Sequence, residues 1–219
     1  MISACITSLN EEKMISDCIK ALRNQVDEII ICDAGSKDDT VTISRALGAK
    51  VYVENSNASE GRNCAAKRSK GDYLLFIDGD CIATPDLVKK LKEEMSARVG
   101  AVYAKVLPTE KDWRSILFCE VISWTNYLPF TGKGPIFLVK KDLFCKAGGY
   151  DEEYVCGEDV ELTLRLMKHT RIKFSSEAVV YTTMRRMKGQ GYLKTLVEWL
   201  ANYLCVLFGF SRQSYQNYR

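Results

Sequence analysis

The sequence contains a single histidine and no long uninterrupted apolar run. One histidine, His169, excludes a histidine-rich metal site and most Ser–His triads, and we interpret it as structural. Because no stretch of 18 uncharged apolar residues occurs, no transmembrane helix is predicted. Internal repeats, low-complexity blocks and a clear linker are also missing. The 219 residues therefore predict one sizeable globular domain.

Closely spaced cysteines are absent as well, although the chain has nine cysteines. No two of them lie within four residues of each other, which argues against a zinc knuckle or a redox C-x-x-C motif. Several lie in apolar runs, where a free cysteine behaves as a small hydrophobic residue. The first residues lack the basic segment and the cleavage pattern of a signal peptide, and they predict a strand. We therefore expect free thiols and a cytoplasmic, reducing location; disulfides in a protein from a hyperthermophile are the exception.

The net charge of +3 is unevenly distributed along the chain. Residues 1–182 carry 25 Lys and Arg against 27 Asp and Glu, a charge of −2, whereas residues 183–219 carry six against Glu198 alone, a charge of +5. A basic segment that is also apolar suits an anionic lipid surface better than a nucleic-acid groove. We expect residues 1–182 to form the main domain, with 183–219 as a basic amphipathic extension of the same structural unit. No nucleic-acid partner is expected.

The extension has a strong amphipathic pattern over residues 192–208, which predicts a helix. The apolar residues at helical spacing are Leu193, Leu196, Val197, Leu200, Leu204, Leu207 and Phe208. Residues 199–210 are nearly all apolar, but they are too few to span a bilayer. Three interpretations stay open: a helix packed on the domain, a peripheral helix at the inner face of the cell membrane, and a contact between two copies of the chain.

Strand and helix signals alternate along the first half of the chain, with short connections. This alternation predicts an α/β fold with a mostly parallel, Rossmann-like central sheet and flanking helices. Strands are predicted at residues 2–8, 28–32, 50–54, 73–77, 99–106, 136–139, 171–174 and 178–182. Helices are predicted at residues 11–24, 39–47, 59–69, 86–98, 113–127, 159–168 and 192–208, with a short one ending at Lys146. The second half is less regular than the first.

The most informative motif is Asp78-Gly79-Asp80, which directly follows the apolar run 73–77. A buried strand that ends on two carboxylates places them at the carboxyl edge of the sheet, where open α/β sheets bind ligands. Buried carboxylates need a cation, and a divalent metal that also binds phosphates satisfies this need. Two solvated turn aspartates are the alternative interpretation.

Two further acidic sites follow a strand or a turn. Asp33 ends the second predicted strand, where its carboxylate can accept a hydrogen bond from a base N–H or a ribose hydroxyl. Helix capping explains the nearby Asp38 and Asp39 well, but it explains Asp33 poorly. Asp159 follows Glu158 at a helix start, where a carboxylate can take the proton of an acceptor hydroxyl. The alternative there is the favourable interaction of first-turn acids with the helix dipole.

Cations are available at two places. Arg62, in the predicted helix 59–69, can neutralise a phosphate or orient a carboxylate, although a lone helical arginine is more often solvated. Arg185 and Arg186 belong to a basic segment that can meet a diphosphate, a lipid phosphate or a membrane surface. A solvated basic turn is the alternative.

Six motifs occur in a fixed order along the chain. They are Thr7-Ser8-Leu9-Asn10-Glu11-Glu12, Asp33-Ala34-Gly35-Ser36-Lys37-Asp38, Gly61-Arg62-Asn63, Gly71-Asp72-Tyr73-Leu74-Leu75-Phe76-Ile77-Asp78-Gly79-Asp80, Gly148-Gly149-Tyr150-Asp151-Glu152 and Gly157-Glu158-Asp159. Together they resemble family-2 glycosyltransferases of the GT-A fold, over about residues 2–182. The resemblance implies metal-dependent, inverting transfer of a sugar from a nucleoside diphosphate, with Mn or Mg as cofactor. It favours a UDP-sugar over a GDP-sugar as donor, and we expect a glycan hydroxyl or a lipid-linked acceptor, including a lipid phosphate.

The resemblance also implies a role for each matching position. The implied nucleotide-sugar-binding residues are Thr7, Leu9, Glu11, Asp33, Arg62, Asp78 and Gly79. Asp33 would contact the base and Asp78 the ribose, whereas Asp80 would hold the metal and Asp159 would be the catalytic base. Residues expected near the diphosphate or the acceptor are Glu158, Gly149, Arg185 and Arg186.

The sequence departs from the family pattern at two points, and other interpretations stay open. Ala34 stands where a second aspartate is commoner, and the Q-x-x-R-W signature is absent, which argues against processive synthesis. Asp78 and Asp80 are also similar to the nucleophile and the acid/base of haloacid-dehalogenase-type phosphatases, although that motif usually ends a first strand. A membrane-associated protein that binds a nucleotide sugar without catalysis is a further alternative. A nucleotidyltransferase is disfavoured because no G-x-G-x-R-like loop follows the first strand.

Overall fold

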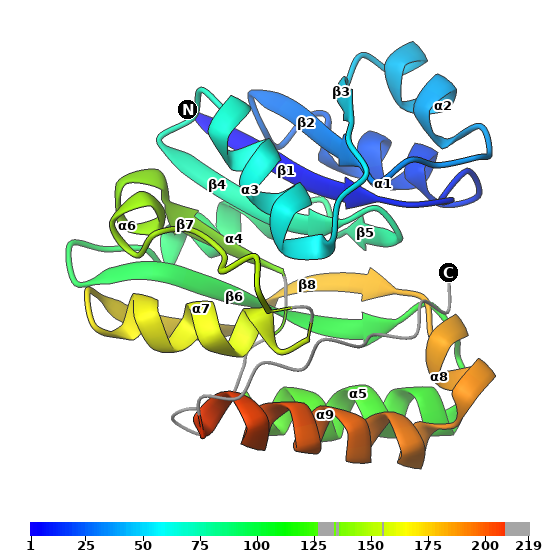
Figure 1. Ribbon diagram of the computed structural model, residues 1–219, viewed down its shortest axis with the longest axis vertical. Coiled ribbons are helices and arrows are strands. Elements are labelled where there is room, and N and C mark those ends of the chain that lie inside the picture. Colours follow the sequence, from blue (N-terminus) through cyan, green and yellow to red (C-terminus); the bar gives the residue numbers. More distant parts are fainter. Residues whose placement is uncertain (127–133, 135, 155, 209–219) are drawn as a thin grey trace.

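The computed structural model describes residues 1–126, 134, 136–154 and 156–208. Within these residues, a central sheet has the strand order β3-β2-β1-β4-β7-β6-β8-β5 (Figure 1). The strands are β1 (Ile2–Ser8), β2 (Glu28–Asp33), β3 (Lys50–Val53), β4 (Tyr73–Asp78), β5 (Cys81–Ala83), β6 (Val99–Pro108), β7 (Phe137–Lys140) and β8 (Arg171–Thr182). The helices are α1 (Ile15–Leu22), α2 (Thr40–Ala46), α3 (Ala58–Arg68), α4 (Leu87–Glu93), α5 (Trp113–Thr125), α6 (Lys141–Lys146), α7 (Glu158–Met167), α8 (Arg185–Gln190) and α9 (Tyr192–Leu207).

The first four strands of the chain are mutually parallel, which confirms the expected α/β fold with a mostly parallel sheet. Strand β7 is antiparallel to both of its neighbours, β4 and β6, and β5 is antiparallel to β8. The direction of β7 could not be predicted, because an apolar run shows that a strand is buried but not which way it runs beside its neighbour.

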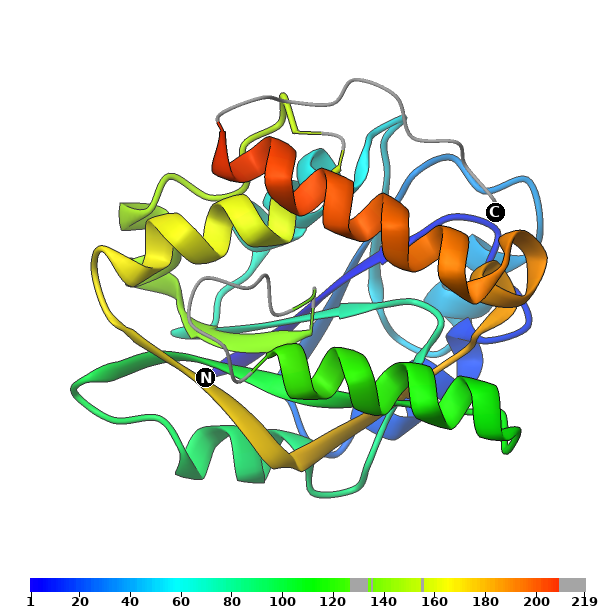
Figure 2. The same ribbon diagram turned by 90° about the horizontal axis from the view of Figure 1, so that it is seen from below.

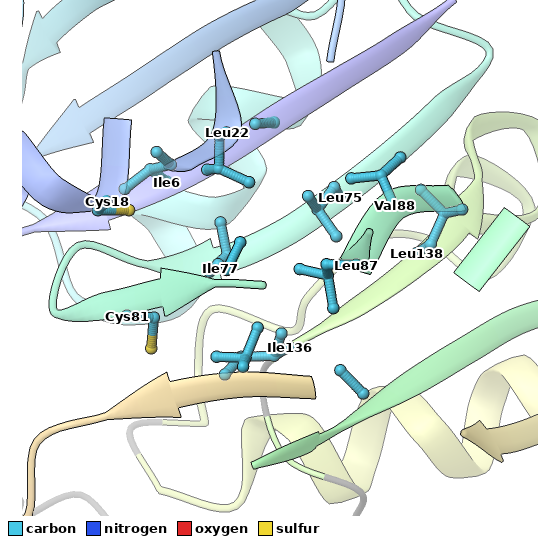
Figure 3. Close-up of a cluster of buried hydrophobic side chains, with 14 of the residues drawn as sticks. Ile6, Cys18, Leu22, Leu75, Ile77, Cys81, Leu87, Val88, Ile136 and Leu138 are labelled. Atoms are coloured by element: carbon cyan, nitrogen blue, oxygen red, sulfur yellow. The ribbon is translucent and has the colours of Figure 1, made fainter. Parts of the chain in front are cut away.

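Alternating side chains of the strands point to opposite faces of the sheet, and each face has its own apolar core. On β4, Leu75 and Ile77 belong to one core, whereas Leu74 and Phe76 belong to the other. Helices α1 and α4 contribute to the first core, part of which is shown in Figure 3. Helices α3, α6 and α7 contribute to the second. The sheet is therefore covered on both faces, as a largely parallel sheet requires.

Several element boundaries differ from those expected. The segments 171–174 and 178–182 form one strand, β8, whose pairing with β6 shifts register where the polar residues Ser175, Ser176 and Glu177 occur. The helix expected at 11–24 begins only at Ile15, because residues 11–14 form a turn on the carbonyl of Glu11. The helix expected at 86–98 ends at Glu93.

Helices α5 and α9 lie on the same side of the molecule and run in the same direction (Figure 2). The Ser115 and Tyr192 hydroxyls are 2.7 Å apart, and the Phe118 ring packs against both Tyr192 and Trp199. The expected amphipathic helix is thus present, and its inner side packs on α5. In the part of the chain that is described, none of the helices combines the length and apolarity needed to cross a membrane.

The expectation of free thiols is wrong for Cys32 and Cys64, which form a disulfide. Cys32 is in β2 and Cys64 is in α3, which packs against that strand, so the two side chains meet although 32 positions separate them. Sequence spacing could not reveal this pair, because disulfide geometry depends on the distance between Cβ atoms in the folded chain.

Candidate functional site

The site lies where β1, β2 and β4 end at the same edge of the sheet. Thr7 is paired in register with Asp78, and Ser8 is paired with Asp33. Because these strands are parallel, their carboxyl ends bring together side chains that are far apart in sequence. The starts of α7 and α8 and the middle of α3 contribute the remaining residues. The structure therefore gathers most of the predicted residues into one region.

Arg62 is the central cation of this region, and it is only 4 % exposed. Its Nη1 donates to Glu158 Oε1 at 2.9 Å and lies 3.7 Å from Asp159 Oδ1, and its Nη2 donates to Asp78 Oδ1 at 3.2 Å. The guanidinium also lies over the Tyr150 ring, 5.2 Å from its centroid. A buried arginine with several donors suits this arrangement, since each carboxylate would be costly to bury alone. Arg62 thus connects the end of β4 to the start of α7.

Asp159 has the side chain best suited to accept a proton. The pKa of its carboxyl is raised to about 7, chiefly by burial and also by the charges of Glu158 and Asp78, while Arg62 opposes the rise. The Tyr150 hydroxyl donates to Asp159 Oδ1 at 3.2 Å, and because burial raises the pKa of Tyr150, that phenol stays protonated. A carboxylate with a pKa near neutrality can exchange a proton with a bound hydroxyl.

Two glycines allow the close packing around these residues. A Cβ atom on Gly79 would lie 3.2 Å from the Thr7 carbonyl oxygen, whose hydrogen bond from the Gly79 N–H is 3.1 Å long. Gly149 has a φ of +71°, and its Cβ would lie 2.8 Å from Asn63 Oδ1. Any larger residue at either position would push the Asp78 turn or the Tyr150 loop away from its partner.

The carboxylates of Asp80 and Glu11 lie at the second part of the site, next to α8. Arg185 forms an ion pair with the buried Glu11, and its Nη2 is 3.9 Å from Asp80 Oδ2. The Asp80 side chain is 24 % exposed and accepts a 3.6 Å contact from the Cys81 thiol. Arg185 is 41 % exposed, so a ligand can reach both the arginine and Asp80.

The donor set around Asp80 fits a metal that is shared with a ligand. Among the residues that the structure describes, no three His, Cys, Asp or Glu side chains gather into a cage for a metal ion. Mg²⁺ and similar ions, however, are commonly held by one or two carboxylates together with the phosphates of a substrate. Asp80, with Glu11 near the same Nη2 atom of Arg185, offers this smaller number of oxygen ligands.

Asp33 occupies a different environment from the one expected. It is fully buried, and its carboxylate accepts four hydrogen bonds of 2.6–3.1 Å, from the Ser8 hydroxyl, the Gly35 N–H, and the N–H and hydroxyl of Ser36. These bonds organise the turn that follows β2. Contact with a nucleobase would require one of these donors to be exchanged, and this role of Asp33 stays a prediction.

The remaining predicted residues border the site. Thr7 is buried and donates to Asp78 Oδ1 at 3.1 Å, whereas Leu9 is half-buried just after β1. Glu158 is the first residue of α7, and Arg186 is half-buried in α8. The roles assigned to these residues stay predictions.

Sequence reasoning missed two residues that hold the site together. Tyr150 orients Asp159, and Asn63 binds the same loop: its Oδ1 accepts from the Tyr150 N–H at 2.9 Å, and its Nδ2 donates to the Tyr150 carbonyl oxygen at 2.8 Å. Each belongs to one of the six sequence motifs: Tyr150 directly follows Gly149, and Asn63 directly follows Arg62. Their position next to predicted site residues could have identified them.

The comparisons with known proteins agree with this geometry. Residues 3–155 match the sequence profile of a family described as Glycosyl transferase family 2. An uncharacterized glycosyltransferase of Haemophilus influenzae is 28 % identical over 187 residues, which cover 77 % of this chain and 62 % of that protein. The chain thus spans less than two thirds of the length of this relative.

Two solved structures are similar in fold. Glucosyl-3-phosphoglycerate synthase from Mycobacterium tuberculosis, in complex with Mn²⁺, UDP-glucose and phosphoglyceric acid, has a TM-score of 0.66 at 21 % identity, covering 97 % of this chain and 81 % of that one. The mannosyltransferase PcManGT from Pyrobaculum calidifontis, in complex with GDP-Man and Mn²⁺, has a TM-score of 0.73 at 16 % identity, covering 96 % of this chain and 65 % of that one.

Proposed function

The chain belongs to glycosyltransferase family 2, with the GT-A fold, and on this basis we propose that it transfers a sugar from a nucleoside diphosphate to an acceptor hydroxyl with inversion. The observation that carries the proposal is the Asp159 carboxylate, whose pKa is raised to about 7 beside the Arg62 cluster. Single displacement needs one base, whereas retention by double displacement needs a second carboxylate as nucleophile. The neighbouring Asp78 and Glu158 are both bound to Arg62.

In this mechanism, Asp159 takes the proton of the acceptor hydroxyl as the hydroxyl oxygen bonds to the anomeric carbon. The bond between that carbon and the diphosphate oxygen breaks, and its electron pair leaves with the nucleoside diphosphate. Tyr150 holds the Asp159 carboxylate in place through its hydroxyl. A hydroxyl is favoured over a lipid phosphate as the acceptor, because an ionised phosphate oxygen has no proton for the base to remove.

For the donor, we propose a UDP-sugar bound along the carboxyl ends of β1, β2 and β4. Thr7, Leu9, Glu11 and the Asp33 turn would border the nucleoside, with Asp78 on the ribose. The proposal is supported by the similar solved structures, which hold UDP-glucose in one case and GDP-Man in the other. A GDP-sugar is therefore the second donor to be tested.

For the cofactor, we propose Mn or Mg held by Asp80, with Glu11 close by. When bound, such an ion neutralises the charge of the departing diphosphate. Arg185 and, behind it, Arg186 would supply further positive charge on the same side, since α8 begins beside Asp80. Support comes from the Mn²⁺ ions in both similar structures and from the Asp80 and Glu11 carboxylates, which both lie beside Arg185 Nη2.

For the extension, we propose that residues 183–219 form the acceptor side of the enzyme and that transfer is non-processive. Helix α8 reaches the site through Arg185, and the far end of α9 touches the loop before α7: a Cβ on Gly157 would lie 2.7 Å from Val206 Cγ2. The described part of the extension, residues 183–208, therefore borders the site both at the start of α8 and near the end of α9. This proposal keeps the predicted division of the chain into a main domain, residues 1–182, and an extension, residues 183–219.

The proposal is tested by release of UDP or GDP from nucleotide sugars, with and without Mn²⁺, by the wild type and by two variants. We expect Asp80→Ala to abolish metal-dependent donor hydrolysis, and Asp159→Asn to abolish transfer while leaving UDP binding intact. Asp142→Asn, in α6 and outside the site, is the matched control. Phosphate release from phosphomonoesters without turnover of any nucleotide sugar would favour the phosphatase interpretation. Binding of a nucleotide sugar with no turnover would favour the non-catalytic one.

A further inference from the structure

We propose that α5 and α9 together form a docking face for an anionic membrane surface. This face, called here the α5–α9 face, consists of the outward-pointing apolar side chains of the two helices and Phe208. The sequence suggested a membrane contact for the C-terminal helix alone. The structure adds a second helix, an ordered arrangement of charge, and a connection to the site.

Helix α5 carries an exposed apolar stripe on its outer side. Trp113, Leu117, Val121 and Trp124 recur every three or four residues, so they lie on one side of the helix. The two tryptophans at the ends are the most exposed, at 68 % and 66 %. Single exposed apolar residues are ordinary, but a row of them marks an interaction surface. Tryptophan is the residue most typical of a membrane interface, because its ring is apolar and its N–H is polar.

Helix α9 carries a matching stripe. Leu193, Val197, Leu200, Leu204 and Phe208 have the same spacing, and all of them are exposed. The other side of α9 is already packed, since Thr195 and Val206 are buried and Trp199 contacts Phe118. The exposed stripe is therefore additional to the apolar surface that holds α9 on the domain.

The two helices that carry the stripes lie on the same side of the molecule and meet in their first halves. The helices are in contact through the Ser115–Tyr192 hydrogen bond and the Phe118 ring, and they run in the same direction (Figure 2). Two rows on helices of the same direction and the same side make a broader surface than either helix alone. An amphipathic surface of this kind can enter the boundary between lipid headgroups and acyl chains without crossing the bilayer.

The charges around the face identify an anionic partner. Residues 105–126 and 184–208 carry seven Lys and Arg against four Asp and Glu. All four acids have a partner within the protein: Glu110 and Asp112 pair with Lys188, Glu120 pairs with Lys105, and Glu198 accepts a hydrogen bond from Gln190. These pairs also use Lys105 and Lys188, and the excess of three positive charges in the two segments makes the field at this surface positive.

The cations also gather at one end of the face. Lys111 directly precedes α5 and Arg114 is in its first turn, whereas Lys194 is in the first turn of α9 and Lys188 is in α8, just before it; because the helices are parallel, both starts lie together. The Arg114 guanidinium lies 5.4 Å from the Trp113 ring centroid, so charge and apolar surface meet there. A second copy of the chain would bring the same cations to the interface, whereas acidic lipid headgroups would neutralise them.

The face also leads to the site. Arg185 follows the cationic end and contacts Glu11, and Val206 near the other end packs against Gly157, just before Glu158. A docked protein would thus hold the acceptor side of its pocket close to the lipid headgroups. Given the proposed function, the acceptor would be a hydroxyl on a glycan that is anchored in the same membrane.

The docking face is tested by flotation of the full chain with phosphatidylcholine vesicles and with vesicles that also contain phosphatidylglycerol. We expect binding only to the anionic vesicles, and weaker binding at high salt. Trp113→Glu and Leu200→Glu should each lower the affinity by roughly tenfold, through lost apolar contact and added repulsion. Met167→Glu, at an exposed apolar position on α7 away from the face, should bind as the wild type does.

Three results would overturn the docking proposal. In the first, the wild type does not bind the vesicles. In the second, the Trp113→Glu and Met167→Glu variants bind equally well. In the third, light scattering shows a dimer that Leu200→Glu converts to a monomer, and the wild type binds no vesicles. The last result would assign the face to a second copy. Because flotation needs no donor or turnover, failure of the proposed glycosyl transfer would leave this result unaffected.

Discussion

The Arg62 guanidinium and the Asp159 carboxylate lie 3.7 Å apart in the interior of the site, with side-chain exposures of 5 % and 19 %. Asp78 and Glu158 share the same guanidinium. One positive charge therefore faces three carboxyl groups, so full ionisation of all three leaves a charge of −2 in a poorly solvated place. Burial, together with this imbalance, explains why one of them, Asp159, holds a proton up to neutral pH despite its arginine partner.

The first prediction concerns pH. The pKa of Asp159 is about 7, and a general base works only when it is ionised, so transfer should rise with pH and level off above neutrality. At pH 6, about a tenth of the sites carry an ionised base, and kcat/KM should fall roughly tenfold from its plateau. The measurement is the pH profile of kcat/KM for transfer to a hydroxyl acceptor. A flat profile between pH 5 and 8, at constant donor binding, would contradict the role given to Asp159.

The second prediction concerns stability. Arg62→Ala removes the only cation that contacts Asp78, Glu158 and Asp159 within the described residues, and it should cost about 3–5 kcal/mol of unfolding free energy. Lys67→Ala is the matched control, since Lys67 is exposed on the same helix; it should change stability by less than about 0.5 kcal/mol. Urea denaturation measures both variants. Equal effects for the two would mean that the carboxylates do not depend on Arg62.

The third prediction concerns Arg185. If this residue contacts the diphosphate, Arg185→Ala should weaken UDP binding in the presence of Mn²⁺ by roughly tenfold or more, as expected for lost hydrogen bonds to a charged group. Arg185→Lys should retain part of the affinity, because it keeps the charge but not the planar fork of donors. Titration calorimetry provides the measurement, and Arg171→Ala, exposed at the start of β8, is the control. If Arg185→Ala binds UDP as tightly as the wild type does, Arg185 does not contact the diphosphate and only pairs with Glu11.

The fourth prediction concerns the disulfide between Cys32 and Cys64. It closes a loop across 32 positions, so reducing it should lower the unfolding free energy by about 3–4 kcal/mol. The bond lies next to Asp33 and two residues from Arg62, and reduction should also weaken donor binding. Denaturation with and without dithiothreitol tests this, with Cys145→Ser, at an exposed free cysteine, as the control. An unfolding free energy that is the same with and without dithiothreitol would show that the disulfide does not stabilise the protein in solution.

Much of the site could be predicted because its residues lie in short motifs at strand ends. Asp78 and Asp80 could be placed at the sheet edge from the apolar run before them, and Asp159 from its position at a helix start. The partner of Arg62 could not be predicted, because Glu158 is 96 positions away and only packing of α3 against the α7 start brings them together. The Glu11–Arg185 pair could not be predicted either, because its members are 174 positions apart and only the folded chain brings them together.

For Asp33, the sequence motif predicted the position of the residue but not its hydrogen-bond partners. Its position after β2 was predicted, but the number of protein donors that reach its carboxylate was not. Ser8, on the neighbouring strand, supplies one of them, and this donor depends on the β1–β2 register.

The amino-acid sequence by itself determined the α/β class, the carboxyl-edge site, the family and the helix at the C-terminal end, because each depends on local periodicity or on a contiguous motif. The tertiary structure alone decided the antiparallel direction of β7, the Cys32–Cys64 bond, the sharing of one guanidinium among three acids, and the alignment of α5 with α9. Each of these depends on distances between segments remote in the chain, which are set by the packing of the whole sheet and its helices and not by any neighbouring residues.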